Sequence, residues 1–137
     1  PVKSYSTDDT NDWSAVLKLT YRKRSFLFTG DVETTAESDM IASKQNLRAD
    51  VIKIGHHGAK TSTSEAFLNG VKPTYAVISV GKENTYGHPT AEVINRLKIH
   101  KINIFRTDQQ GTIIAKTDGT HLSFNVRPIS SDSNIAH

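Results

Sequence analysis

Apolar and polar residues alternate over two early segments of the chain, and this alternation predicts a pair of β-strands. The first segment, WSAVLKLTY, begins at Trp13, and the second, RSFLFTG, ends at Gly30. The basic residues Arg22-Lys23-Arg24 lie at the junction, and a short polar break between two alternating segments is typical of an antiparallel hairpin. We therefore expect a hairpin that places Asp31 directly after its second strand.

The segments that follow alternate between helical and extended patterns. The stretch 32–47, rich in Ala, Glu, Ser and Lys, predicts a helix, and 91–100 predicts another with Thr90 as its N-cap. Residues 62–65 (STSE) have the pattern of a capping box for a third helix, which 69–70 (NG) would end. Runs rich in β-branched residues predict further strands, at 49–54, 74–80, 102–107, 112–117 and 121–126.

The resulting order, β-β-α-β-α-β-α-β-β-β, predicts an α/β fold with a mixed sheet, helices on one face and closing antiparallel strands. A chain of 137 residues with 36% hydrophobic and 23% charged residues suits one globular domain, expected over 1–129. The polar stretch 130–137 (SSDSNIAH) is expected to be a disordered tail. No apolar run is long enough for a membrane span, so we expect the chain as given to be soluble.

Two features of the composition limit the chemistry. The chain has no cysteine, which excludes disulfides and thiolate ligands, so any metal must be held by His, Asp or Glu. The 17 Lys and Arg residues exceed the 14 Asp and Glu residues, giving a net charge of +3. Such a charge suits a phosphate-bearing partner without requiring one.

Polar side chains follow three of the predicted strands. Asp31 comes after FLFTG, His56 and His57 come after VIKIG, and His88 lies in the loop after TYAVISV. Ligands of α/β folds bind outside the carboxyl ends of the strands, so these side chains are expected to meet in one crevice. Carboxylate and imidazole are suitable ligands for zinc or another first-row metal.

Each of these residues, taken alone, also has a purely structural interpretation. Asp31 is a suitable cap for the helix that follows it. Either member of the His56-His57 pair is compatible with a hydrogen-bonded structural imidazole. His88, which precedes Pro89, suits a turn beside a helix start. The coincidence of all of them at strand ends, with glycines flanking the histidine pair, favours a shared site.

The motifs together resemble a known family. The series FLFTGD, ADVIKIGHHGAKTSTS, YGHP and RTDQQGTI, in this order over about residues 10 to 120, is similar to the metallo-β-lactamase-like hydrolase domain of the ComEC competence (DNA-uptake) proteins. The resemblance implies a sandwich of two sheets between helices, with a two-metal site, zinc or manganese, that hydrolyses phosphodiester bonds in DNA.

The resemblance also implies a role for each site residue. Asp31 would bridge both ions, and either His56 or His57 would supply a further ligand. His57 and His88 would be the catalytic residues, with His88 as substrate contact, proton donor or ligand. Alternatives to a DNA phosphodiesterase are a hydrolase of another ester, such as a phosphocholine ester or a lactone, and a catalytically incomplete structural or nucleic-acid-binding module.

The sequence departs from the family pattern in its metal ligands, and this changes the activity expected of the chain alone. The H-x-H-x-D-H segment, which carries most metal ligands of the family, does not occur in the sequence. The chain therefore resembles the carboxyl-terminal half of the domain, expected to be inactive alone and to expose a strand edge or apolar face to self-association. Its expected partners are the missing amino-terminal half, DNA or another phosphodiester, and the membrane channel domain of a parent protein, with this domain outside the cytoplasm.

Overall fold

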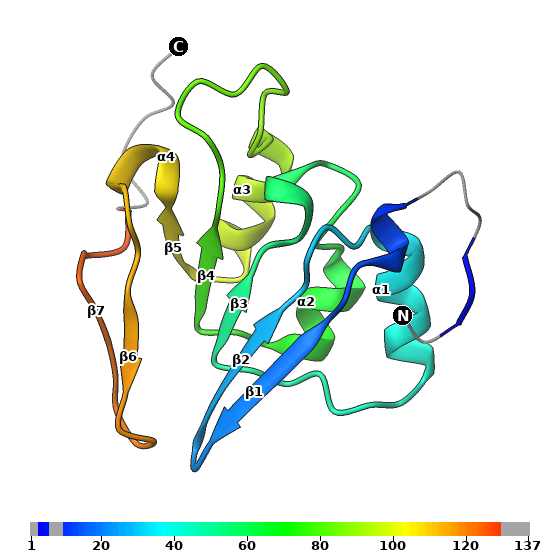
Figure 1. Ribbon diagram of the computed structural model, residues 1–137, viewed down its shortest axis with the longest axis horizontal. Helices are drawn as coiled ribbons and strands as arrows, with labels where there is room; N and C mark the ends of the chain where they lie inside the picture. The colour runs from blue at the N-terminus through cyan, green and yellow to red at the C-terminus, as the bar shows by residue number, and fades with distance from the viewer. Residues whose placement is uncertain (1–2, 6–9, 130–137) are drawn as a thin grey trace.

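A computed structural model describes residues 3–5 and 10–129, so the tail predicted at 130–137 lies outside the described residues. A five-stranded sheet with the order β1-β2-β3-β4-β5 forms its centre (Figure 1). β1 pairs with β2 in antiparallel fashion, and the remaining pairs are parallel. The strands are β1 (Leu17–Tyr21), β2 (Arg24–Phe28), β3 (Val51–Lys53), β4 (Tyr75–Ile78) and β5 (Asn103–Arg106). The predicted α/β fold with a mixed sheet is confirmed.

Helices cover one face of this sheet. They are α1 (Thr34–Ala42), α2 (Glu65–Val71) and α3 (Ala91–Ile99), with a short α4 (Thr107–Gln110) and two 3-10 turns, η1 (Asn11–Trp13) and η2 (Gly55–Gly58). Leu27, Ile52, Ala76 and Ile104 are neighbours across β2 to β5, and each is at most 3% exposed. They belong to one core cluster with apolar residues of the three longer helices, which lie together behind the sheet in Figure 1.

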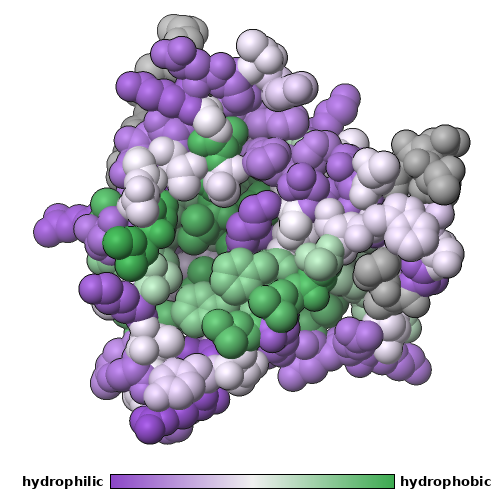
Figure 2. Space-filling view, viewed as in Figure 1, coloured by the Kyte–Doolittle hydropathy of each residue, from purple (hydrophilic) through white to green (hydrophobic). Residues whose placement is uncertain are grey.

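The opposite face of the sheet is covered only in part. β6 (Ala115–Thr117) and β7 (Leu122–Phe124) form a separate antiparallel pair. The centroid of the Phe124 ring lies 4.3 Å from that of Phe105 and 4.9 Å from that of Tyr75. Next to this pair an apolar groove remains, and Figure 2 shows the hydrophobic surface around it. We call this surface the open sheet face; it comprises Leu17, Leu19, Phe26, Phe28 and Val51.

Some predicted element boundaries are wrong. Trp13 belongs to η1, and β1 begins only at Leu17. The helix predicted over 32–47 ends at Ala42, because Lys44 has a left-handed backbone (φ 58°) that a helix does not accept. α4 begins at Thr107, the last residue of the strand predicted over 102–107, and was not predicted.

The capping box predicted at 62–65 would make Ser62 the N-cap of α2, and this prediction is wrong. The N-cap of α2 is Ser64, whose Oγ accepts a hydrogen bond from the Phe67 amide at 3.2 Å. Ser62 instead donates to the carbonyl oxygens of Gly55, at 2.8 Å, and Ala59, at 3.0 Å. α2 also continues through 69–70, whereas Thr90 caps α3 as predicted.

Within the described part of the chain, no helix has the length and apolar content that crossing a membrane requires.

Glu37 of α1 anchors the loop that leads from η2 into α2. Its side chain is only 1% exposed, and its carboxylate accepts hydrogen bonds from the backbone amides of Thr63 and Ser64. From α3, Arg96 donates to the carbonyl oxygens of Ser62 (3.2 Å) and Thr63 (2.7 Å). Two helices therefore hold the segment that follows the histidine pair.

Glu37→Gln is expected to lower the free energy of unfolding by about 1–3 kcal/mol, because the new amide group would face a backbone N–H. Burial raises the pKa of Glu37 above its ordinary value of 4.5, so the folded protein binds this proton more tightly than the unfolded chain does. The stability from this group is complete below the unfolded pKa and is lost as pH rises through the folded pKa. Urea denaturation at several pH values should show the advantage of the native residue narrowing as pH rises.

Glu83→Gln, on an exposed loop, is the matched control and should change the unfolding free energy by less than about 0.5 kcal/mol. An advantage of Glu37 over Gln that widens with rising pH would contradict the assigned pKa direction.

Candidate functional site

Asp31 lies in a tight turn directly after β2. Gly30 has φ 57°, and a Cβ at this position would lie 2.7 Å from the Ser14 Cβ, so the turn needs glycine. The Asp31 amide donates to the Ser14 Oγ at 3.0 Å. The N-cap of α1 is Glu33, so Asp31 is not the helix cap that one interpretation suggested. Its carboxylate, 40% exposed, is available to a ligand.

The histidine pair has an unusual backbone. His56 (φ 43°) and His57 (φ 55°) both adopt the left-handed conformation, which costs a residue with a side chain about 1–2 kcal/mol. Surrounding contacts hold the turn: the His56 amide donates to the Gly30 carbonyl at 3.3 Å, and the Gly58 carbonyl accepts from the Thr90 amide at 3.0 Å. Strain held in this way is typical of functional sites.

His57 directs one ring nitrogen toward Asp31. Its Nδ1 lies 2.7 Å from the carbonyl oxygen of Ser79, and since a carbonyl only accepts, Nδ1 carries the proton. In the neutral form of this tautomer the lone pair is on Nε2, which lies 3.9 Å from the Asp31 Oδ1. A carbonyl that fixes the tautomer of a histidine in this manner is typical of metal-ligating imidazoles.

His56 has different neighbours. Its Nδ1 lies 2.8 Å from the Glu33 Oε1, although without the angles of a hydrogen bond. Its ring contacts His57 (centroids 6.2 Å apart) and His88 (5.6 Å) edge to face. The structure therefore places His56 between Glu33 and His88, whereas His57 is the histidine that contacts Asp31.

His88 reaches the same site from the loop between β4 and α3. The His88 amide donates to the Asn84 Oδ1 at 3.0 Å, and the Asn84 Nδ2 donates to the His88 carbonyl at 2.8 Å. Burial lowers the pKa of His88, and the charges of His56 and His57 lower it further. The three regions predicted to meet at one edge of the sheet are therefore brought together.

Lys53 adds a positive charge beside Asp31. It ends β3, and its Nζ donates to the Gly30 carbonyl at 2.8 Å and lies 3.6 Å from the Asp31 Oδ1. Burial lowers the pKa of Lys53, and the neighbouring Asp31 opposes this effect. Sequence reasoning missed this residue, although a single lysine inside the apolar run VIKI is a visible signal.

Asp31 and His57 supply only part of a metal ligand set. Zinc lies about 2 Å from its ligands, so one ion can contact both atoms across the 3.9 Å that separates Asp31 Oδ1 from His57 Nε2. Among residues 3–5 and 10–129, no group of three or more His, Cys, Asp or Glu side chains is arranged to hold a metal ion. The described residues therefore fit two ligand positions and supply no third.

Comparison with known proteins gives the relationship of the chain. No family model matches it. ComE operon protein 3 of Bacillus subtilis is 40% identical over 125 residues, which is 91% of this chain and 16% of that protein. Competence protein ComA of Neisseria gonorrhoeae is 42% identical over 106 residues (77% of this chain, 15% of that protein). The chain is therefore homologous to competence-related proteins.

Recombination protein 2 of Haemophilus influenzae extends this relationship, with 38% identity over 103 residues, 75% of this chain and 13% of that protein. The predicted similarity to competence proteins is confirmed. In each of these three matches the chain spans less than a fifth of its competence-related relative.

Proposed function

We propose that the chain forms one side of a metal-dependent site that hydrolyses phosphodiester bonds in DNA, within a metallo-β-lactamase-like domain. The observation that supports this most directly is the convergence of the Asp31 carboxylate and the His57 Nε2, with the tautomer of His57 set by Ser79. Homology to competence-related proteins supports DNA as the substrate. Zinc and manganese suit a ligand pair of carboxylate and imidazole.

Each side chain of the site would have a separate role. A divalent ion, when bound, supplies a Lewis acid and lowers the pKa of water. Asp31 and His57 would hold it, and Lys53 would keep the Asp31 turn in place through the Gly30 carbonyl. With its lowered pKa, His88 is neutral near neutral pH, so its ring offers one donor and one acceptor to a phosphate ester.

A second function is a nucleic-acid-binding module without catalysis. It is favoured by the lack of a third donor among the described residues and by the ammonium of Lys53, 3.6 Å from the Asp31 Oδ1. A cation in this position opposes a metal ion and attracts phosphate. A measurement of metal binding therefore distinguishes the hydrolase from the nucleic-acid-binding module.

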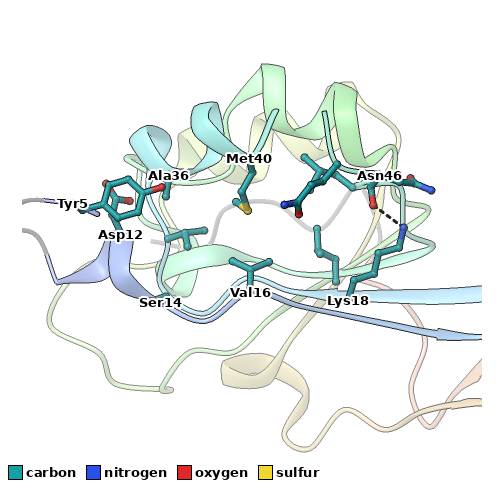
Figure 3. Close-up of a pocket in the computed structure, with 12 residues that line it drawn as sticks. Tyr5, Asp12, Ser14, Val16, Lys18, Ala36, Met40 and Asn46 are labelled. Atoms are coloured by element: carbon teal, nitrogen blue, oxygen red, sulfur yellow. Dashed lines mark hydrogen bonds between the residues drawn. The ribbon is translucent and has the colours of Figure 1, made fainter. Parts of the chain in front are cut away.

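The open sheet face supports a partner within the same protein. Leu17 is 61% exposed and Leu19 51%, and the outer strand β1 pairs only with β2 among the described strands. A groove follows β1 on its helix side, lined by Val16, Met40 and other residues (Figure 3). We propose that the amino-terminal half of the domain covers this face and edge and brings the remaining ligands, and that a membrane channel domain adjoins it in the parent protein.

His57→Ala is expected to weaken zinc or manganese binding by about tenfold or more, because it removes the nitrogen that faces Asp31. The measurement is equilibrium dialysis followed by metal analysis, on the full-length protein in which this chain occurs, together with cleavage of single-stranded DNA.

The matched control is His121→Ala, since the His121 side chain lies on the exposed turn between β6 and β7, where its Nδ1 is 3.0 Å from the Asp118 Oδ2. Unchanged metal content and cleavage in His57→Ala would refute the hydrolase. DNA binding that persists without any metal binding in the native protein would instead support the binding module.

A further inference from the structure

Four aromatic rings form a continuous row that leads from the candidate site into solvent. The ring of His56 lies 6.2 Å from His57 and 5.6 Å from His88, each edge to face. The His88 ring in turn stacks with Tyr86, with centroids 5.9 Å apart and planes inclined by 24°. Tyr86, the outermost ring, is 81% exposed. The Tyr86 ring is thus nearly parallel to the ring of a site histidine and offset from it, and most of its surface is open to solvent.

The loop that carries Tyr86 has its own internal support. Asn84 donates to the carbonyl oxygens of Gly81 (3.1 Å) and His88 (2.8 Å) and accepts from the His88 amide. At its end, the Thr90 amide donates to the Gly58 carbonyl at 3.0 Å, which ties the loop to the histidine turn. Figure 1 shows this loop, between β4 and α3, rising beyond the carboxyl ends of the strands. These contacts hold the backbone on both sides of Tyr86 in place relative to the histidine turn.

A single exposed aromatic residue is ordinary on a protein surface. Tyr86 differs because its ring ends a row of ring contacts that begins at His57, beside Asp31. A single strand whose phosphodiester is held at that pair carries flat bases along its length, and the exposed Tyr86 ring offers one of them a surface on which to stack. Stacking on an aromatic side chain accepts every base, because every base has a π-face.

We infer that Tyr86 is a stacking platform for a nucleobase of single-stranded DNA whose phosphodiester lies at the Asp31–His57 pair. The inference rests on the proposed function and adds a base-binding subsite to it. It predicts that part of the affinity depends on the presence of a base and not on its identity. The hydroxyl group of Tyr86 has no part in this binding.

The test compares a single-stranded oligonucleotide with one of the same length whose nucleotides are abasic. Binding is measured by fluorescence anisotropy on the full-length protein, at fixed salt, with zinc or manganese added and with phosphorothioate linkages in both strands so that the DNA stays intact. Tyr86→Ala is expected to weaken binding of the base-bearing strand by about tenfold and to leave the abasic strand unchanged. Tyr86→Phe and Tyr86→Trp are expected to keep the native preference.

Lys82→Ala, an exposed residue of the same loop, is the control for charge and should weaken binding of both strands to the same extent. An equal loss for both strands in Tyr86→Ala, or a native protein that does not distinguish them, would overturn the inference. Hydrolysis is measured separately with added zinc or manganese. A lack of cleavage refutes the hydrolase, whereas the base-dependent difference alone decides the role of Tyr86.

Discussion

Asp31→Asn is expected to reduce metal-dependent cleavage of DNA by about a thousandfold or more, because the ion that activates water would lose its carboxylate ligand. Asparagine keeps the size of the side chain but removes its negative charge. Its neutral amide also no longer balances the ammonium of Lys53, which lies 3.6 Å from the Asp31 Oδ1. Cleavage of a labelled oligonucleotide and bound metal per protein are measured on the same full-length preparation.

The loss should come with little change in folding, since the Asp31 side chain is 40% exposed and surface charge pairs contribute about 0–1 kcal/mol. Asp118→Asn, at an exposed position on the turn between β6 and β7, is the matched control and should retain cleavage. Native cleavage by Asp31→Asn would rule out Asp31 as a metal ligand.

Gly58→Ala is expected to lower the free energy of unfolding by about 2–5 kcal/mol, from backbone strain and overpacking combined. Gly58 has φ 86°, and a Cβ there would lie 2.6 Å from the Cβ of Pro89 and 3.0 Å from its Cα. Relief of this clash requires the loop that carries His88 to move away from the histidine turn. Urea denaturation measures the loss of stability.

Gly81→Ala provides a close comparison, because a Cβ at Gly81 would meet no atom within 4 Å and the residue lacks a positive φ. Its effect on the free energy of unfolding should be within about 1 kcal/mol of zero, measured in the same denaturation series. Equal stability of the two alanine variants would contradict the close approach of Pro89 to Gly58.

Most of the order of strands and helices was predictable from the sequence, because these elements have local signals: alternation of apolar and polar residues, helix-forming composition, caps, or runs of β-branched residues. The alternation around Leu19 and Leu27 marks strands with two distinct faces, and Thr90 is a typical cap. The convergence of Asp31 with the histidines also followed, since parallel strands bring their carboxyl ends to one edge. These inferences needed only the residue types and their spacing.

Other parts of the site depend on information that residue types do not contain. Ser79 acts through its backbone carbonyl, so no side-chain pattern marks it. His57, and not His56, faces Asp31 because two successive residues adopt left-handed backbone conformations. The sequence of a non-glycine pair does not indicate such conformations. Lys53 is typical of a solvent-facing strand position, and only the parallel register with Phe28 brings it to the Asp31 turn.

The carbonyl oxygen of Gly30 accepts hydrogen bonds from both the Lys53 ammonium, at 2.8 Å, and the His56 amide, at 3.3 Å. One acceptor therefore connects β3, the histidine turn and the residue that precedes Asp31. Substitutions that share a partner are not independent, so their free energies do not add. Single substitutions at Lys53 and at the histidine turn would each report part of the same interaction, and only a double-mutant cycle would apportion it.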